Sequence, residues 1–485
     1  MTPTPLLTDL YQLTMAQGYF LEGLSDAQAS FTYSFRENPF EGGFAIAAGT
    51  ELLRDFLSDW QFSAEDCAWL ATLKATDGSA LFVPAFLEWL KSLRFTADVA
   101  AVAEGTVVFA REPLVRVTGA LACCQLIEST LLNLMNFSTL IATKAARCYL
   151  AADGDPILEF GLRRAQGPDG GVTASRAAYV GGCSATSNMV AAQRFAIPPA
   201  GTHAHSWIMA HDGEQAAFAA WTRASANNAI LLVDTYDSLK GVENAIHAGA
   251  ALEAAGGHFA GIRLDSGDLA WLSRRAREML DKAGLTQAKI IASNDLDEYT
   301  ITSLKDQGAA IDSWGVGTRL VTGDGQSALG GIYKMTALKP VGSDRWQPKL
   351  KVSDQAAKTS TPGLQGLRRY FSHENKPEGD MIYDLNRTPD PGASATIVDP
   401  QDMTRQKTFA ANTKHSELLE PLLKVGKATG TTSPLKTLRE KTISGLAALD
   451  TSHTRLLHPH TYPVGLEKTL FEQQLALVKE HKGVQ

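Results

Sequence analysis

The sequence predicts an α/β protein in which repeated βα units, forming a parallel sheet or barrel, are joined to an α+β domain. From about Pro156 onward, short β-rich runs alternate with helical segments, which is the pattern of βα repeats. Residues 1–135 mix strand-like runs and helices without that alternation, as in an α+β domain. A chain of 485 residues is long enough for both, because one domain usually takes about 100–200 residues.

The first predicted domain is residues 1–135. We expect strands at residues 29–35, 105–110 and 114–118. The most regular helical pattern runs from about Leu121 to Ala152, so this helix carries the chain into the next domain.

The second predicted domain, residues 136–338, holds the βα units. Each expected strand ends in polar residues, and in a parallel barrel the loops after the strands converge to form the active site. We therefore expect the chemistry at these strand ends. The expected strands are residues 157–160, 230–233, 261–264, 289–292 and 313–316, and the expected helices are residues 213–224, 238–255, 269–283 and 299–307.

The last part of the chain, residues 339–485, is rich in Lys, Ser, Thr, Pro and Gly. Its helical pattern returns near residues 418–424 and 467–481. We expect this segment to pack back on the first domain. Four cations, Lys334, Lys349, Lys351 and Arg368, could help to bind polyphosphate, but a solvated surface explains them better.

Composition and charge exclude several partners. The formal net charge of −7 offers no general attraction for nucleic acid, and no basic stretch is interleaved with aromatic residues. The richest apolar run, from Leu121 to Ile127, is far shorter than the roughly 18 residues that cross a bilayer. The amino terminus lacks the cationic and apolar segments of a secretory signal, so we expect a cytoplasmic protein.

The 5 cysteines form no Cys-x-x-Cys pair. An odd number in so long a chain argues against a disulfide framework and a structural zinc site. We expect reduced, mostly buried thiols.

Two histidines, His203 and His205, follow a turn marked by prolines. A His-x-His pair suggests a metal site, but no third ligand lies at a clear spacing. A hydrogen-bonded structural histidine therefore explains the pair better than a metal site does.

The segment from Arg263 to Asp268 follows an expected strand and opens an expected helix. It places the carboxylate of Asp265 two residues after a guanidinium, with Ser266 at the helix start. A helix amino terminus beside an arginine is suited to bind phosphate or carboxylate, whereas a surface turn with an aspartate cap is the alternative.

Three other strand ends are ambiguous on their own. Asp234 follows one strand, and Phe160 with Arg163 follows another, where a core phenylalanine and a solvated arginine are an equally good explanation. At a third strand end, Gly317 and Thr318 could let a phosphate approach the backbone, but a tight turn explains them about as well.

Taken together and in order, eight segments resemble the nicotinate phosphoribosyltransferase family. The resemblance runs from Leu7 to about Leu338 and becomes weaker beyond it. The segments are residues 8–15, 38–40 with 42–49, 128–147, 159–164, 201–206, 233–237, 263–268 and 315–318.

The resemblance implies an α+β domain joined to an irregular α/β barrel, in a homodimer whose active sites lie at the subunit interface. Tyr11 resembles the aromatic residue that one subunit lends to its neighbour's site, and Phe160 resembles its stacking partner. A pyridine ring between two aromatic rings gains about 0.5–1.5 kcal/mol for each pair beyond burial alone.

The resemblance also implies roles for the charged residues. Arg263 resembles the partner of the nicotinate carboxylate or of neighbouring substrate oxygens, and Arg163 resembles a holder of the ribosyl phosphate. Asp234 and Asp265 resemble the carboxylates that orient the ribose hydroxyls and the Mg²⁺-pyrophosphate. The remaining substrate-binding matches are Ser266, Gly317 and Thr318, the last two in the phosphate-binding turn.

Of the two histidines, His205 matches the residue that the family phosphorylates. A neutral ring nitrogen must face the γ-phosphate of Mg-ATP while the other is hydrogen-bonded. Nicotinamide-using relatives carry an aspartate where this chain has Ser187. Because an aspartate repels a carboxylate, this difference favours nicotinate.

The implied reaction joins nicotinate to 5-phosphoribosyl-1-pyrophosphate, with Mg²⁺ as cofactor and ATP as co-substrate. Catalysis would come from positioning and from neutralising the leaving group, without a protein nucleophile. One alternative is another anion-binding barrel enzyme, including the quinolinate-using relative, which needs more cations around the ring. Another is a binding or sensory paralogue, which should have lost His205, Asp265 or Arg263.

Overall fold

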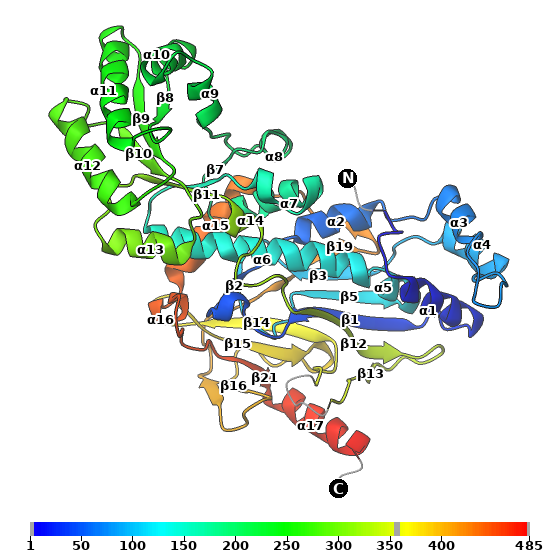
Figure 1. Cartoon of the computed structure of the whole chain (residues 1–485). Helices are drawn as coiled ribbons and strands as arrows, with labels where there is room; N and C mark the ends of the chain where they lie inside the picture. Colours follow the sequence, from blue (N-terminus) through cyan, green and yellow to red (C-terminus); the bar gives the residue numbers. More distant parts are fainter. Residues whose placement is uncertain (1–3, 354–358, 483–485) are drawn as a thin grey trace. The chain divides into compact units, whose positions relative to one another are not determined.

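The structure is a computed structural model that describes residues 4–353 and 359–482. The chain forms two compact units (Figure 1). Unit 1 comprises residues 1–140, 328–434 and 441–485, and unit 2 comprises residues 141–327 and 435–440. Unit 1 therefore draws on both ends of the chain.

The larger sheet of unit 1 has seven strands in the order β13-β12-β1-β5-β3-β19-β20. At its centre, β1 (Gln28–Phe35) pairs antiparallel with both β5 (Val115–Ala120) and β12 (Gly331–Lys339). Strand alternation turns Phe31, Tyr33 and Phe35 to one face, where the ring of Phe31 stacks on Tyr333 at 5.0 Å. The remaining strands are β3 (Asp98–Val102), β13 (Gln347–Pro348), β19 (Leu419–Lys424) and β20 (Lys427–Ala428).

The helix predicted at residues 121–152 is divided at Ile127. α5 (Leu121–Leu126) ends there and α6 (Glu128–Ala152) begins one residue later. α1 (Leu10–Leu21) packs on α5. The other helices of the first 140 residues are α2 (Thr50–Ser58), α3 (Ala64–Leu70) and α4 (Pro84–Ser92).

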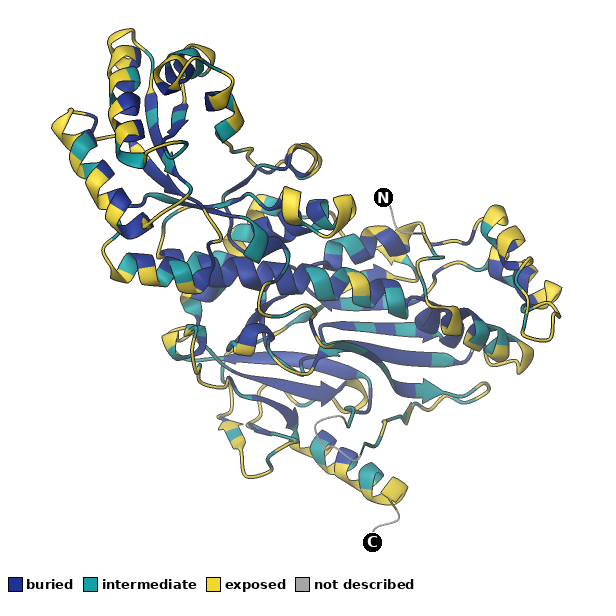
Figure 2. Cartoon of the chain, viewed as in Figure 1, coloured by how far each residue is buried: buried dark blue, intermediate teal, exposed yellow. Residues whose placement is uncertain are grey.

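The second sheet of unit 1 comes from the carboxyl-terminal part of the chain. It has six strands in the order β17-β16-β21-β15-β14-β18. Figure 2 shows that the central strands of both unit-1 sheets are mostly buried. Their bounds are β14 (Gln365–Phe371), β15 (Pro377–Asp384), β16 (Ala395–Val398), β17 (Gln406–Phe409), β18 (His415–Glu417) and β21 (Val464–Glu467).

Two expectations about this region are wrong. Residues 418–424 are not helical, because Pro421 cannot sit inside a helix and the short apolar run pairs as β19 with β3. Arg368 is not a solvated cation, since its side chain is 3% exposed and its Nε donates to Glu417 Oε1 at 2.6 Å. The helix predicted at residues 467–481 is confirmed as α17 (Lys468–Lys482).

Unit 2 contains the predicted βα units. Its six strands form a curled sheet, half of a barrel, in the order β7-β6-β11-β10-β9-β8. All neighbouring strands in it are parallel. The five strands expected from the sequence are present: β6 (Ile157–Glu159), β8 (Ala229–Leu232), β9 (Phe259–Leu264), β10 (Lys289–Ala292) and β11 (Ser313–Val316).

The four expected helices of unit 2 are also present. They are α10 (Glu214–Ala224), α11 (Ser238–Ala254), α12 (Leu269–Lys282) and α13 (Glu298–Asp306). An aspartate caps three of them: Asp237, Asp268 and Asp297 accept from backbone N–H groups in the first turns of α11, α12 and α13. These caps set where each loop becomes a helix, so the loops after the strands are short and defined.

The segment between β6 and β8 was not predicted in detail. It contains β7 (Ala185–Thr186), α7 (Gly167–Val180), α8 (Met189–Phe195) and α9 (His205–Met209). All 5 cysteines are free and buried. Among the described helices, none combines the length and apolar character needed to cross a membrane.

Candidate active site

Three neighbouring strand ends of unit 2 bring polar side chains together. Asp234 follows β8 by two residues, Asp265 directly follows β9, and Ser293 directly follows β10. Because these strands are parallel neighbours, their carboxyl ends lie along one edge of the sheet. The predicted carboxylates therefore meet, since Asp234 Oδ2 accepts from the Asp265 backbone N–H at 2.9 Å and from Ser266 Oγ at 2.6 Å.

Arg263 is held by three partners. Its Nη2 lies 2.7 Å from Asp265 Oδ1, its Nε donates to Ser293 Oγ at 2.8 Å, and its Nη1 donates to Thr202 Oγ1 at 3.0 Å. Ser293 also donates to Asp265. Burial alone would raise the pKa of Asp265, but Arg263 and Ser293 outweigh burial and hold this pKa below its ordinary value. Asp265 is therefore an anion at neutral pH.

One carboxylate oxygen of Asp234 has no hydrogen-bond partner among the described residues. Its Oδ2 is occupied as described, whereas its Oδ1 is buried without a hydrogen-bond partner in the described parts of the chain. An unpaired buried carboxylate oxygen costs free energy unless a ligand completes it. This oxygen could accept a hydrogen bond from a ligand hydroxyl or coordinate a cation.

The aromatic ring of Phe160 lies beside Arg263 of this cluster. Its backbone N–H donates to Val316 O at 2.8 Å, which continues the parallel pairing of β6 with β11. A Cβ atom at Gly315 would lie 2.7 Å from the Phe160 ring, so a side chain there would displace the ring. The guanidinium carbon of Arg263 lies 5.7 Å from the centre of the ring. The guanidinium therefore lies over the ring, so a flat aromatic ligand bound against Phe160 would have this cation beside it.

Ser187 lies at the next strand end. It follows β7, and its backbone N–H donates to Glu159 O at 2.9 Å, which places it beside the residue before Phe160. Glu159 itself is buried and accepts from Thr186 Oγ1 at 2.5 Å and from the Gly161 N–H. This buried carboxylate fixes the turn that carries Phe160.

His205 lies at the start of α9, half-exposed and in contact with the same cluster. Its Nδ1 is 3.2 Å from Thr235 Oγ1, and its Nε2 is 3.8 Å from Asp265 Oδ2. Thr235 follows Asp234 in the chain. The group that fixes the His205 ring, which the sequence did not identify, is therefore the hydroxyl of Thr235.

His203 has a different environment. It is 5% exposed and packs edge-on against Trp221, with ring centres 4.9 Å apart. Its Nε2 accepts from the Leu232 backbone N–H at 3.2 Å, so this nitrogen carries no proton. Burial lowers the pKa of His203 to about 4. His203 is thus a neutral, buried structural residue.

The other predicted residues lie outside this hydrogen-bonded network. Arg163 is exposed in a short 3₁₀ helix, Leu162–Arg164, after β6. Gly317 is the N-cap of the short helix α14 (Thr318–Val321), and its carbonyl accepts from the Leu320 N–H at 3.1 Å. Tyr11 belongs to unit 1, where its side chain is half-exposed on α1.

Sequence reasoning missed Thr202, Thr235 and Ser293. All three carry a hydroxyl that contacts Arg263 or His205. Residues with hydroxyl groups are common at strand ends and turns, so the sequence alone does not single them out. One signal was available for Ser293, because it begins a polar strand ending. The residues after it, Asn294 and Asp295, have φ values of 105° and 43°, a left-handed backbone of the kind found at functional sites.

The site is suited to a cation held jointly with a ligand. No group of three or more His, Cys, Asp or Glu side chains is placed to hold a metal ion by itself among residues 4–353 and 359–482. Mg²⁺, however, is commonly bound by one or two carboxylates together with substrate phosphates. The carboxylates of Asp234 and Asp265 fit that arrangement.

The fold and this cluster define an α/β protein in which two carboxylates and an arginine meet at the carboxyl ends of parallel strands. Models of the nicotinate phosphoribosyltransferase family match the chain in three parts: the N-terminal domain at residues 6–136, the family model at residues 156–379, and the C-terminal domain at residues 365–474. The chain therefore belongs to the nicotinate phosphoribosyltransferase family.

Individual relatives agree with this assignment. The chain is 38% identical over 480 residues to a nicotinate phosphoribosyltransferase of Bacillus subtilis, covering 99% of this chain and 96% of the relative. The crystal structure of human nicotinic acid phosphoribosyltransferase superimposes with a TM-score of 0.85 at 31% identity, covering 97% of this chain and 99% of that one. A nicotinate-nucleotide pyrophosphorylase from Pyrococcus furiosus, 20% identical with a TM-score of 0.69, shares the fold.

Proposed function

We propose that the protein is a nicotinate phosphoribosyltransferase. It joins nicotinate to 5-phosphoribosyl-1-pyrophosphate and releases nicotinate mononucleotide and pyrophosphate. Family membership supports the reaction. The observation that carries it is the guanidinium of Arg263 over the Phe160 ring, 5.7 Å from its centre, because an aromatic acid bound against Phe160 would lie within reach of a cation that can pair with its carboxylate.

The displacement occurs at C1 of the ribose. The pyridine nitrogen forms a bond to C1 as the bond from C1 to the pyrophosphate oxygen breaks, so the electron pair leaves with the pyrophosphate. The free Oδ1 of Asp234 accepts from a ribose hydroxyl and fixes the sugar. Holding both reactants in line contributes several kcal/mol to the rate, and no protein nucleophile is needed.

The leaving group requires neutralisation. When bound, Mg²⁺ would be held by Asp234, Asp265 and the pyrophosphate, and it would offset the charge that develops on the leaving oxygen. Arg263 keeps Asp265 ionised, so this carboxylate remains a ligand at neutral pH. Arg163, Ser266, Gly317 and Thr318 complete the binding of the ribosyl phosphate.

ATP couples to the reaction through His205. With Nδ1–H donated to Thr235, the lone pair of Nε2 faces the site. Nε2 attacks the γ-phosphorus, the bond to the β-phosphate oxygen breaks, and ADP leaves. Later hydrolysis of the phosphohistidine drives the equilibrium toward nucleotide formation, which makes the enzyme a ligase of NAD salvage.

The active unit is a homodimer in the cytoplasm. Tyr11 of one subunit covers the pyridine ring that Phe160 of the other subunit supports. The exposure of Tyr11 on α1 supports this role, because an aromatic side chain exposed by half is available to a second chain.

Product analysis tests the reaction. The protein is mixed with Mg²⁺, 5-phosphoribosyl-1-pyrophosphate and either nicotinate, nicotinamide or quinolinate, and products are identified by mass. We expect nicotinate mononucleotide and pyrophosphate from nicotinate. Turnover of quinolinate alone, with loss of carbon dioxide, would instead identify a quinolinate-using enzyme, and no turnover of any acid would identify a binding paralogue.

A further inference from the structure

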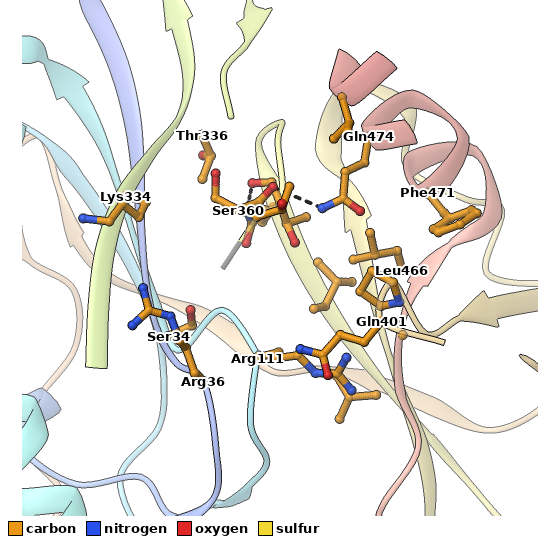
Figure 3. Close-up of a pocket in the computed structure, with 18 of the residues that line it drawn as sticks. Ser34, Arg36, Arg111, Lys334, Thr336, Ser360, Gln401, Leu466, Phe471 and Gln474 are labelled. Carbon is orange, nitrogen blue, oxygen red and sulfur yellow. Dashed lines mark hydrogen bonds between the residues drawn. The ribbon is translucent and has the colours of Figure 1, made fainter. Parts of the chain in front are cut away.

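Unit 1 contains a cavity whose lining residues do not belong to the candidate active site. Its volume is about 550 Å³, within the roughly 300–1,000 Å³ of small-molecule sites. It lies between the two sheets of unit 1, with β1 and β12 on one side and β15, β21 and α17 on the other (Figure 3).

The β1 and β12 wall is polar where a space between two sheets is usually apolar. Strand alternation places Thr32 and Ser34 of β1 on this wall, and their register partners Lys334 and Ile332 come from β12. Thr336 follows on the same face of β12. Tight packing of the sheets alone gives no reason for a lysine and three hydroxyls here.

One of these hydroxyls lacks a partner. Thr32 is 4% exposed, and its Oγ1 is buried without a hydrogen bond to any residue that the structure describes. Such a group costs about 1–3 kcal/mol if nothing satisfies it. A ligand in the cavity would supply the missing partner.

Two cations of the wall are also unpaired. Arg36 and Lys334 make no ion pair within residues 4–353 and 359–482, and Figure 3 shows their charged ends on the same side of the cavity. In contrast, Arg111, which also lines the cavity, is paired with Asp399 at 2.6 Å. Asp402 at the rim is paired with Arg405 at 3.2 Å, so it does not cancel the two free cations.

The far wall has the opposite character. Leu466 of β21 and Phe471, Leu475 and Val478 of α17 present apolar side chains to the cavity. Gln474 is tied back, because its Nε2 donates to Ser360 O at 3.1 Å (Figure 3). Lys482 at the end of α17 also lines the cavity, so the far wall is mostly apolar, whereas the β1 and β12 wall carries Lys334 and Arg36.

We propose that this cavity binds a small organic anion. Its phosphate or carboxylate group lies against Lys334, Arg36 and the hydroxyl of Thr32, and its apolar body packs on β21 and α17. The inference does not depend on the reaction in unit 2.

The test uses 8-anilinonaphthalene-1-sulfonate, an apolar anion that fluoresces when it leaves water. We expect saturable binding of one probe per full-length chain. Lys334→Met should weaken binding at least about tenfold, which is the value of roughly 1.4 kcal/mol. Lys351→Met removes the same charge from an exposed residue outside the cavity, and it should leave binding unchanged.

Thr32→Val is the most specific variant. It keeps the shape of the side chain and removes a hydroxyl that has no protein partner, so the folded protein should be equally or more stable. We expect it to retain nucleotide synthesis and to bind the probe more weakly. Unchanged probe binding in both Thr32→Val and Lys334→Met would overturn the proposal.

Competition identifies the anionic group. Hexyl phosphate and octanoate are each titrated against the bound probe, and displacement by either supports the site and shows which head group it prefers. If neither displaces the probe, or if 5-phosphoribosyl-1-pyrophosphate with Mg²⁺ displaces it equally well from the wild type and from Lys334→Met, the probe is not in this cavity and the proposal fails.

Discussion

The Nδ1 atom of His205 lies 3.2 Å from the Oγ1 atom of Thr235. Thr235 directly follows Asp234, so one strand end provides both the carboxylate with a free oxygen and the hydroxyl that orients the histidine. The two proposed chemistries, ribose displacement and phosphoryl transfer, thus depend on adjacent residues of one loop.

Thr235→Val should separate the two chemistries. It removes the hydrogen bond that orients His205, so phosphorylation of the protein by ATP should slow by up to about tenfold, while ATP-independent nucleotide formation stays unchanged. Incorporation of γ-³²P measures the first rate and mass analysis the second. Thr235→Ser keeps a hydroxyl and should restore phosphorylation. Equal loss of both activities would show that Thr235 is merely structural.

His205→Ala should lose the acid-labile phosphoprotein and ATP hydrolysis, and it should keep slow nucleotide formation without ATP. His203→Ala should remain labelled by γ-³²P-ATP, because His203 is buried and uses Nε2 to accept from Leu232. We expect His203→Ala to lower the free energy of unfolding by about 2–4 kcal/mol, because the substitution leaves a cavity and an unsatisfied Leu232 N–H. A labelled His205→Ala protein would mean that another residue is the phosphate acceptor.

The pKa of His203 predicts a dependence of stability on pH. Its folded-state pKa of about 4 is below the usual value of roughly 6.5, so the unfolded chain takes up a proton that the folded chain refuses. The folded protein therefore has its full stability, with respect to this group, above about pH 6.5. It loses free energy of unfolding as the pH falls from 6.5 toward 4. At pH 5 the loss should be about 2 kcal/mol.

Urea unfolding of the wild type and of His203→Gln at pH 7.5 and pH 5.0 measures this loss. The difference between the two pH values should be about 2 kcal/mol smaller in the variant, because glutamine does not titrate. The same difference in both proteins would contradict a neutral, buried His203.

Ser187 should set the choice between acid and amide. Nicotinate should be used at least about tenfold better than nicotinamide, judged by kcat/KM. Ser187→Asp should lower nicotinate use further, since a second anion would face the carboxylate. Ser187→Ala is the control for loss of the hydroxyl without added charge. Equal use of both substrates by the wild type would contradict this role.

Tyr11 and Arg263 should complement each other across a dimer. Tyr11→Ala and Arg263→Ala proteins should each be inactive, whereas their mixture should recover activity, because each hybrid dimer contains one site with both residues intact. Subunit exchange is verified first by native mass spectrometry of differently tagged chains. Exchange without recovery would exclude a shared site.

The elements of unit 2 could be predicted because each carries its own local signal. β11 was predicted with the same bounds, Ser313–Val316, and α11 and α12 begin at the predicted residues, Ser238 and Leu269. β7 could not be predicted, since it has two residues and exists only through pairing with β6. The helix predicted around Pro421 was wrong: the proline already argued against a helix, whereas the pairing of this run with β3 could not be read from the sequence.

The charged residues of the candidate active site could be predicted from the sequence. Asp234, Asp265 and Arg263 meet because parallel strands end together, which strand order alone implies. Their supporting hydroxyls, Thr235 and Ser293, depend on side-chain distances that no sequence pattern records. For the same reason the burial of Arg368, whose partner Glu417 lies in a strand 49 residues away, could not be foreseen.

The pairing of β1 with β12 also has a consequence for synthesis on the ribosome. Gln28 is opposite Lys339, so one edge of a strand made among the first 35 residues lacks its partner until more than 300 further residues have been translated. Most of unit 2, residues 141–327, is complete by then and can fold first. In the meantime β1 presents free backbone N–H and C=O groups beside Phe31 and Tyr33, an open edge that invites pairing with other chains. Nascent chains stalled before residue 331 should therefore depend on chaperones and aggregate when released, whereas in chains that extend beyond β12 this edge of β1 is paired.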